Sequence, residues 1–461
     1  MNMLNPKDIK IAYIGGGSRG WAWKLMKDLA CEKNVCGTVS LYDIDHAAAY
    51  DNAKIGNCIA LDSPEASSWR YAVAETLPAA LKGAHFVIIS ILPGTFQEME
   101  SDVHAPEKYG VYQSVGDTTG PGGLIRALRT VPMFEAFARA IRDYAPNAWV
   151  INYTNPMAMC VGTLYRVFPQ IKAFGCCHEV FGTQEILSVA LAEEMGIPDI
   201  PRAEIKCNVF GINHFTWLDK ASYRGIDLMP LYRRYAEKYR ESGVPLRPAM
   251  AHKSYEFQFN ERVKFDLFFR CGCIAAAGDR HLAEFSPAAW YLKDPETIEG
   301  WGFHITPVSW RWRDLGRRMD VAQALLSHRQ KMEPAPSGEE GVRQIKAIMG
   351  LEDLVTNVNL PNVGQIPNLP MGTIVETNAV FMADAVRPVM AGPLPVSVLE
   401  LVARPAQNQT DIVTAALHRS LEEAYAVFCR ERLLDALTAG DKRALFDEMI
   451  AATRPYLPDY N

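Results

Sequence analysis

The sequence predicts an α/β protein in which a Rossmann-like, doubly wound sheet is followed by a second, α+β domain. Three observations support this fold class. Short apolar runs alternate with helical patterns up to about residue 200, three glycines directly follow the first apolar run, and an antiparallel β pattern with long helical segments begins near Pro201. We therefore expect one domain over residues 1–203 and another over residues 204–461.

The first domain shows the alternation of strand and helix that is typical of βαβ units. Its apolar runs, such as FVIISIL, are nearly continuous, as in parallel strands that helices cover on both faces. Strands are expected at residues 10–16, 37–45, 84–94, 148–156 and 171–179, and helices at residues 21–30, 47–61 and 124–144.

The second domain begins with residues 203–225, whose pattern predicts antiparallel strands. Helical patterns follow between Leu228 and Leu325, and a polar, linker-like stretch covers residues 334–340. Residues 357–381 then predict a loop and a hairpin ahead of a helical C-terminus.

The composition favours a small-molecule partner. The 461 residues carry a formal net charge of −6 and no long run of like charges, so neither nucleic acid nor anionic lipid is an expected partner. The N-terminus has no apolar signal core, and no apolar run is long enough to span a bilayer, so we expect a cytoplasmic protein with no membrane attachment. The ten cysteines are expected to be thiols or metal ligands rather than disulfides.

The glycine-rich turn predicts a dinucleotide site. Gly15, Gly17 and Gly20 fit the pattern G-x-G-x-x-G between a strand and a helix, where backbone amides and the helix N-terminus meet a pyrophosphate. Asp43 follows Gly20 by 43 − 20 = 23 residues, the approximate spacing of the carboxylate that binds an adenosine ribose, which favours NAD over NADP. The alternative is a tight glycine turn beside a solvent-facing aspartate.

Ser90 and Asn152 lie at the ends of two later strands, where an open α/β sheet binds its ligands. We expect both to line the cofactor cleft, although a Pro-Gly turn explains the segment SILPG around Ser90 equally well. Asn155 is placed to bind hydroxyl groups of a ligand or, alternatively, to cap the next helix. The predicted cofactor-binding residues are Gly15, Gly17, Ser18, Arg19, Gly20, Asp43, Ser90 and Asn152.

Two further segments carry metal-binding and acid–base side chains. GCCHEVFG contains Cys177 and His178, and FGINHF contains His214. A thiolate and an imidazole without two further paired ligands suggest a catalytic metal with open positions, whereas lone cysteines and histidines are more often buried structural residues. GDRHLAEF, with Asp279 and His281, indicates a pocket or, alternatively, the capped start of a helix.

With IAYIGGGSRG, LYDID, GDTTGPGG, NYTNPM, CCHEVFG, GINHF and GDRHLAEF in this order, the chain resembles glycoside hydrolase family 4 over nearly its whole length. The resemblance implies a glycosidase that depends on NAD and a divalent metal, unlike enzymes with two catalytic carboxylates. Residues 1–203 would bind NAD, and residues 204–461 would bind substrate and metal. The implied reaction runs through C3 oxidation, C2 deprotonation, elimination, water addition and re-reduction.

The resemblance also assigns roles to individual residues. Cys177 and His214 match the metal ligands, and Mn²⁺ is the implied metal, while Ni²⁺, Co²⁺ and Fe²⁺ stay open because a thiolate and an imidazole suit softer ions. His178 matches the general acid, an imidazole that can work near neutral pH. For the base, Asp279 is the first candidate and His281 the second. Substrate contacts are expected from Asn155, Asp117 and Arg280.

The motif CHEV resembles the subgroup that acts on non-phosphorylated α-glycosides, especially α-galacturonides, with α-glucosidase, α-galactosidase and α-glucuronidase activities as alternatives. A uronate carboxylate needs a cationic partner, for which Arg280, Arg311 and Arg313 are candidates by residue type. The expected partner is a small α-glycoside or oligosaccharide, and the resemblance implies a homodimer or homotetramer. Other classes are an NAD-dependent 2-hydroxy acid dehydrogenase and a non-enzymatic NAD-binding regulator.

Overall fold

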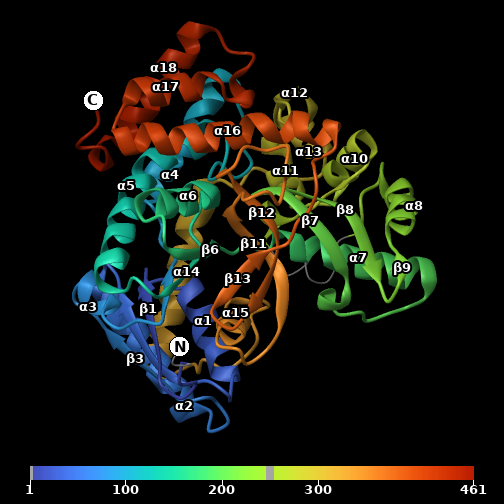
Figure 1. Cartoon of the computed structure of the whole chain (residues 1–461). Coiled ribbons are helices and arrows are strands. Elements are labelled where there is room, and N and C mark those ends of the chain that lie inside the picture. Colours follow the sequence, from blue (N-terminus) through green and yellow to red (C-terminus); the bar gives the residue numbers. More distant parts are fainter. Residues whose placement is uncertain (1–3, 246–253) are drawn as a thin grey trace.

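The computed structural model describes residues 4–245 and 254–461. Its main sheet has nine strands in the order β13-β12-β11-β6-β5-β4-β1-β2-β3 (Figure 1). The six strands from the N-terminal part pair in parallel, and their order reverses between β1 and β4, as in the predicted doubly wound fold. They are β1 (Ile9–Ile14), β2 (Gly37–Tyr42), β3 (Trp69–Val73), β4 (Phe86–Ile89), β5 (Trp149–Asn152) and β6 (Lys172–Gly175).

Helices cover both faces of this parallel part. Helices α1 (Trp21–Cys31) and α2 (His46–Asp62) pack on one face, and α5 (Gly120–Tyr144) and α6 (Met157–Val167) pack on the other. All five strands and three helices predicted in this half are confirmed. The sequence did not predict β3, because this edge strand has five residues and buries little more than Trp69 and Tyr71. The remaining helices of this half are α3 (Leu77–Leu81), α4 (Phe96–His104) and α7 (Glu179–Met195).

A hairpin from the C-terminal half extends the same sheet. Strands β11 (Leu354–Pro361) and β12 (Ile374–Met382) pair antiparallel, which confirms the predicted hairpin. Strand β11 also joins β6 through the pair Asn359 and Gly175, and β13 (Ala385–Pro388) follows β12 at the edge. The division at residue 203 stays a prediction, because this hairpin from the second half belongs to the sheet of the first.

A second, smaller sheet stands beside the first. Strands β7 (Lys206–Ile212) and β8 (Phe215–Tyr223) pair antiparallel, as predicted, and β10 (Ile274–Ala275) and β9 (Ile226–Asp227) flank β8. The helices around the two sheets are α8 (Met229–Tyr239), α10 (Arg262–Cys271), α11 (Asp279–Phe285), α12 (Ala288–Tyr291), α13 (Pro295–Gly300), α14 (Val308–Leu326) and α15 (Gly341–Ile348). The C-terminal helices, red in Figure 1, are α16 (Val396–His418), α17 (Leu421–Cys429) and α18 (Ala439–Thr453).

Two further predictions concern membrane-spanning helices and the state of the cysteines. Within residues 4–245 and 254–461, no helix is both long and apolar enough to cross a membrane. All ten cysteines are free, in agreement with the prediction of thiols.

Candidate active site

A cavity of about 230 Å³ opens beyond the carboxyl ends of β5 and β6. This is where an open α/β sheet places its ligands, since the loops that follow parallel strands meet at this edge. The opposite wall comes from the second half of the chain. Among the predicted site residues, the cavity is lined by Asp117, Asn155, Cys177, His178, His214, Arg280 and His281.

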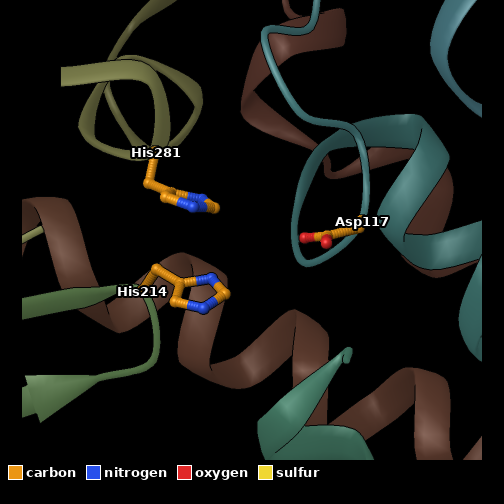
Figure 2. A group of neighbouring side chains, drawn as sticks. All are labelled: Asp117, His214 and His281. Carbon is orange, nitrogen blue, oxygen red and sulfur yellow. The ribbon is translucent and has the colours of Figure 1, made fainter. Parts of the chain in front are cut away.

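Three of these side chains converge on one another. Asp117 comes from the loop before α5, His214 from the turn between β7 and β8, and His281 from α11 (Figure 2). One ligand atom from each lies within 4.8 Å of the others. The Thr118 hydroxyl donates to Asp117 Oδ1 at 2.7 Å and lies 3.1 Å from His214 Nδ1. Because that hydroxyl proton is already used, His214 Nδ1 is the donor to Thr118, and His214 Nε2 keeps a lone pair for a cation.

The electrostatics of this group suit a divalent cation. Burial, together with the neighbouring His281, lowers the pKa of His214 to about 3, and burial also lowers the pKa of His281. Burial alone would raise the pKa of Asp117, but Arg126 and the two imidazoles lower it to about 2. At neutral pH the group therefore holds a carboxylate and two neutral imidazoles, which are the protonation states that bind metal ions.

Cys177 lies on the wall of the same cavity and is supported from behind by the hairpin. The Asn357 amide donates to the Cys177 carbonyl oxygen at 3.2 Å and to Glu376 Oε1 at 2.6 Å. The Asn213 amide, next to His214, donates to Glu376 Oε2 at 3.1 Å. Glu376 is thus the common acceptor behind both predicted metal ligands. Burial, with Glu376 and Glu179 nearby, raises the pKa of the Cys177 thiol, so this thiol stays protonated until a cation offsets the negative charge.

Sequence reasoning missed Glu376 and its asparagine partners. A signal was present, because each of these two strands carries three polar residues among apolar ones, with Asn357 in β11 and Glu376 in β12. Both are buried, and burial raises the pKa of Glu376 to about 7. The pairing of the two residues depends on the antiparallel register of β11 and β12, which cannot be read from the sequence.

His178 is held by a residue of the predicted linker. Its Nδ1 lies 3.3 Å from Glu339 Oε1, which also accepts from Lys24 Nζ at 3.0 Å. Burial would lower the pKa of His178, but Glu339 and Glu179 raise it above its ordinary value. The structure therefore corrects the linker prediction: residues 334–340 pack on α1, where Ser337 donates to Asp28, and supply a partner for the candidate general acid.

Asp279, the first candidate for the base, does not line the cavity. Its carboxylate accepts from the Lys264 N–H at 3.0 Å and is fully buried against α10. Burial and Glu261 raise its pKa to about 7. His281, the second candidate, lines the cavity instead. The physical reason is helical geometry, since residues two apart on a helix point about 200° from each other.

Arg280 and Asn155 both reach the cavity, in different ways. Arg280 donates from Nη2 to the Ser114 carbonyl at 2.8 Å and from Nε to the His304 carbonyl at 3.2 Å. Two of its three guanidinium nitrogens, Nε and Nη2, thereby bond the protein backbone. Helix α6 has Pro156 as its cap residue and no side-chain cap, so the helix-capping alternative for Asn155 is wrong. The Asn155 amide instead lies 3.5 Å from Asp117 Oδ2.

The predicted cofactor residues lie around the glycine turn, with one exception. Gly15 has φ +95°, and a Cβ there would come within 2.0 Å of the Ser90 carbonyl oxygen. The Gly17 N–H donates to Asp43 Oδ2 at 2.8 Å. Asn152 is the exception, because its fully buried side chain bonds both the N–H and the carbonyl of Thr154 and closes its own turn.

The remaining predicted cofactor residues join the turn to α1 and α14. The Ser18 hydroxyl accepts from the Trp21 N–H at 3.1 Å at the start of α1. The carbonyl of Arg19 accepts from Arg318 Nη1 of α14 at 3.2 Å. Gly20 is the cap residue of α1 and offers no side-chain cap, so the first turn of the helix beyond the Trp21 N–H is open to an anionic ligand.

Comparison with known sequences gives a consistent result over the whole chain. The sequence model of the family 4 glycosyl hydrolases matches residues 10–193, and that of the C-terminal domain of the same family matches residues 209–434. An α-galacturonidase of Thermoanaerobacterium saccharolyticum is 58% identical over 98% of this chain and 97% of its own length. An α-galacturonidase of Bacillus subtilis is 51% identical over 96% of this chain and 97% of its own.

Solved structures agree with the fold. The crystal structure of the Bacillus subtilis protein lplD matches with a TM-score of 0.90 and 49% identity over 96% of this chain and 100% of that chain. A 6-phospho-α-glucosidase from gut microorganisms, solved with NAD and Mn²⁺, matches with a TM-score of 0.80 over 99% of this chain and 100% of that chain. At 20% identity, the second match supports the fold alone.

Proposed function

This chain belongs to family 4 of the glycosyl hydrolases, and we propose that it hydrolyses α-galacturonides with NAD and a divalent cation as cofactors. The substrate proposal rests on relatives named α-galacturonidase at more than half identity, whereas an α-galactosidase of Bacillus subtilis is 27% identical. The observation that carries the chemistry is the convergence of Asp117, His214 and His281 beside His178 in one cavity.

The glycine turn fits NAD. The open first turn of α1 meets the pyrophosphate, and the close approach of Gly15 to Ser90 leaves no room for a side chain on the loop. Asp43, already held by the Gly17 N–H, accepts from the ribose hydroxyls and repels a 2′-phosphate. Activation by NAD at concentrations where NADP has no effect is the expected result, and equal activation by NADP contradicts this assignment.

The cavity also fits a divalent cation, for which Mn²⁺ is our proposal. His214 and Cys177 hold it, as the family resemblance implies, and Asp117 adds a carboxylate from the group of three. A neutral imidazole and a carboxylate are ready to bind, whereas Cys177 must lose its proton as the cation enters. Cation binding should therefore release a proton and strengthen as the pH rises.

When bound, NAD and the cation supply a hydride acceptor for the sugar C3 and the positive charge that favours loss of the C2 proton. The residues of this chain then move protons. We assign the base to His281, because its Nε2 faces Glu179 at 4.0 Å while its buried Nδ1 has no partner among the described residues. This arrangement favours a proton on Nε2 and a lone pair on Nδ1.

His178 supplies the acid in the same scheme. Glu339 orients its ring through Nδ1, so that Nε2 can give a proton to the leaving-group oxygen as the C1–O bond breaks. Asn155 and Asp117 lie where they can hold sugar hydroxyls. Water would then add at C1 and a proton would return to C2; because the cofactor would give back the hydride it took, hydrolysis would produce no net NADH.

The decisive experiment compares substrates and redox balance. The protein is incubated with NAD, Mn²⁺ and a thiol reductant against the 4-nitrophenyl α-glycosides of galacturonic acid, glucuronic acid, galactose and glucose. The expected result is fastest release from the galacturonide without accumulation of NADH. Faster release from another glycoside replaces the substrate assignment, and NADH accumulation without release supports a 2-hydroxy acid dehydrogenase instead.

Two broader predictions belong to the same proposal. Residues 1–203 bind NAD and residues 204–461 form the substrate- and metal-binding part, to whose site Asp117, Asn155 and Cys177 of the first part contribute, and the hairpin β11–β12 is a structural addition to the first part. The active form is a homodimer or homotetramer. Light scattering of the purified chain measures the assembly directly, and a monomer that is fully active contradicts it.

A further inference from the structure

Two guanidinium groups line the cavity, and they differ in their hydrogen-bond partners. Arg280 and Arg311 both lie over the ring of Phe257, with guanidinium carbons 4.7 Å and 5.4 Å from the ring centre. Arg280 is almost fully buried, and its Nε and Nη2 donate to the carbonyls of Ser114 and His304 and to the Thr306 hydroxyl. Its charge therefore helps to hold the cavity wall together.

The guanidinium of Arg311 differs from that of Arg280 in this respect. Among residues 4–245 and 254–461, no hydrogen bond or ion pair occupies its guanidinium, although it is partly buried. The carboxylates that act on its charge are Asp117 and Asp314. Asp314 is already bonded to Arg317 and Arg318, each at 2.6 Å, and Asp117 belongs to the group that faces the two histidines. Arg311 thus brings to the cavity a positive charge that no carboxylate among the described residues bonds directly.

Aromatic side chains give this charge a defined position. Phe257 and Trp310 meet edge to face at 4.6 Å, and the Arg311 guanidinium lies 5.4 Å and 5.6 Å from their ring centres. Contact with both rings restricts the long side chain, so less conformational freedom is lost when an anion binds. Arg311 also comes from α14, which contributes none of the residues assigned to the proton transfers.

We propose that Arg311 binds the C6 carboxylate of the uronic acid and is the residue that selects a uronide over a neutral glycoside. The proposal rests on the α-galacturonidase function proposed above. A guanidinium offers two parallel N–H groups to a carboxylate, and one unpaired cation matches the single negative charge of a uronate. A neutral galactoside leaves this cation without a partner, and a phosphorylated sugar brings about two negative charges to it.

Arg313 provides a matched control. It lies two residues further along α14, is exposed, and pairs with Glu256 at 3.5 Å outside the cavity lining. Substitution of either arginine by methionine removes one positive charge from the same helix while keeping an unbranched side chain. Only the Arg311 change removes a charge from the cavity.

The test measures both turnover and binding in the NAD- and Mn²⁺-loaded protein. In Arg311→Met, kcat/KM for 4-nitrophenyl α-galacturonide should fall by roughly 100-fold, as expected when one partner of a desolvated charge pair is lost. Activity on the α-galactoside should stay within about threefold, since a neutral substrate has no partner to lose. Arg313→Met should behave as wild type on both substrates. Retention of the galacturonide preference in Arg311→Met, or an equal loss on both substrates, overturns the proposal.

Two further measurements distinguish failure of the carboxylate site from failure of the proposed function. Arg311→Lys retains the charge without the planar fork, so its KM for the galacturonide should rise by roughly tenfold, and an unchanged KM contradicts bidentate binding. Calorimetry then compares free D-galacturonate with D-galactose as ligands. If wild type binds galacturonate more tightly than Arg311→Met does but hydrolyses no α-galacturonide, the proposed function is wrong and the carboxylate site is supported. If wild type hydrolyses galacturonides and Arg311→Met binds galacturonate normally, the carboxylate site fails alone.

Discussion

The rings of His214 and His281 lie 4.1 Å apart, centre to centre, with their planes inclined by 31°. They come from the turn between β7 and β8 and from α11, two elements that the sequence separates by more than fifty residues. Two imidazoles this close cannot both take up a second proton and its positive charge at low cost, and burial adds to the penalty. The pair therefore stays neutral at physiological pH, as a metal ligand and a general base both require.

Loss of His214 should reduce cation binding. In His214→Ala the affinity for Mn²⁺ should fall by roughly 100-fold or more. One ligand is removed, and the Thr118 hydroxyl loses the His214 N–H that donates to it. Cys177→Ser should abolish metal-dependent activity while the protein stays folded, since a hydroxyl is deprotonated far less readily than a thiol.

Titration calorimetry of the chelator-treated protein with Mn²⁺ measures both changes. The matched control is His418→Ala, because His418 is an exposed histidine paired with Glu423. Normal Mn²⁺ affinity in Cys177→Ser, with activity retained, removes Cys177 from the ligand set. Weakened Mn²⁺ binding in His281→Asn, on the other hand, makes His281 a ligand and not the base.

The base assignment predicts which variant stops proton exchange. With a substrate deuterated at C2, loss of the label to solvent should be slowed by roughly 100-fold or more in His281→Asn, since the amide accepts no proton at neutral pH. Asp279→Asn should exchange at a rate close to wild type, because Asp279 faces Lys264 rather than the cavity. Mass spectrometry of the released sugar follows the label, and the reverse pattern of the two variants returns the base to Asp279.

Glu339 should act through His178 on the departure of the aglycone. Glu339→Gln keeps the size of the side chain but loses the charge that Nδ1 of His178 faces at 3.3 Å. Methyl α-galacturonide, which needs full protonation of its leaving group, should lose roughly tenfold or more in kcat, while the 4-nitrophenyl glycoside loses much less. Comparison of kcat for the two substrates measures the effect. Equal losses on both contradict a role in acid catalysis and leave a purely structural one.

Glu284 should make stability depend on pH. Its carboxyl accepts from the Val115 and Gly116 N–H groups at 2.7 Å and 2.8 Å, and burial raises its pKa from the ordinary 4.5 to about 8. The folded state therefore binds this proton more tightly than the unfolded state does. The contribution of Glu284 to stability is complete below about pH 4.5 and is lost as the pH rises to about 8.

Glu284→Gln should remove that dependence, because an amide oxygen still accepts both N–H groups and does not ionise. Between pH 5.5 and 8, wild type should lose on the order of 2–4 kcal/mol relative to this variant. Thermal unfolding midpoints at the two pH values measure the difference. Glu65→Gln, at a highly exposed glutamate, serves as the control and should follow wild type. Parallel pH profiles of wild type and Glu284→Gln contradict the raised pKa.

Much of the fold was readable from the sequence because its signals are local. The alternation of apolar runs and helical patterns predicted five of the six parallel strands, and the hairpin and the β7–β8 pair were also predicted. The motifs named most of the cavity lining, since strand ends in an open sheet meet at one edge. The site residues that sequence reasoning missed, Glu339 and Glu376, are glutamates from segments far away along the chain from the motifs.

The sequence by itself determined the doubly wound sheet, the glycine turn with Asp43, and the identity of the residues that reach the cavity from the strand ends. Only the tertiary structure decided that His281 faces the cavity while Asp279 faces α10, and that Arg280 bonds three groups of the protein where Arg311 bonds none among the described residues. Strand and helix patterns depend on neighbouring residues, whereas the surroundings of a buried side chain depend on contacts between distant segments. Those contacts set both the direction of each side chain and its charge state, and with them the chemistry of the site.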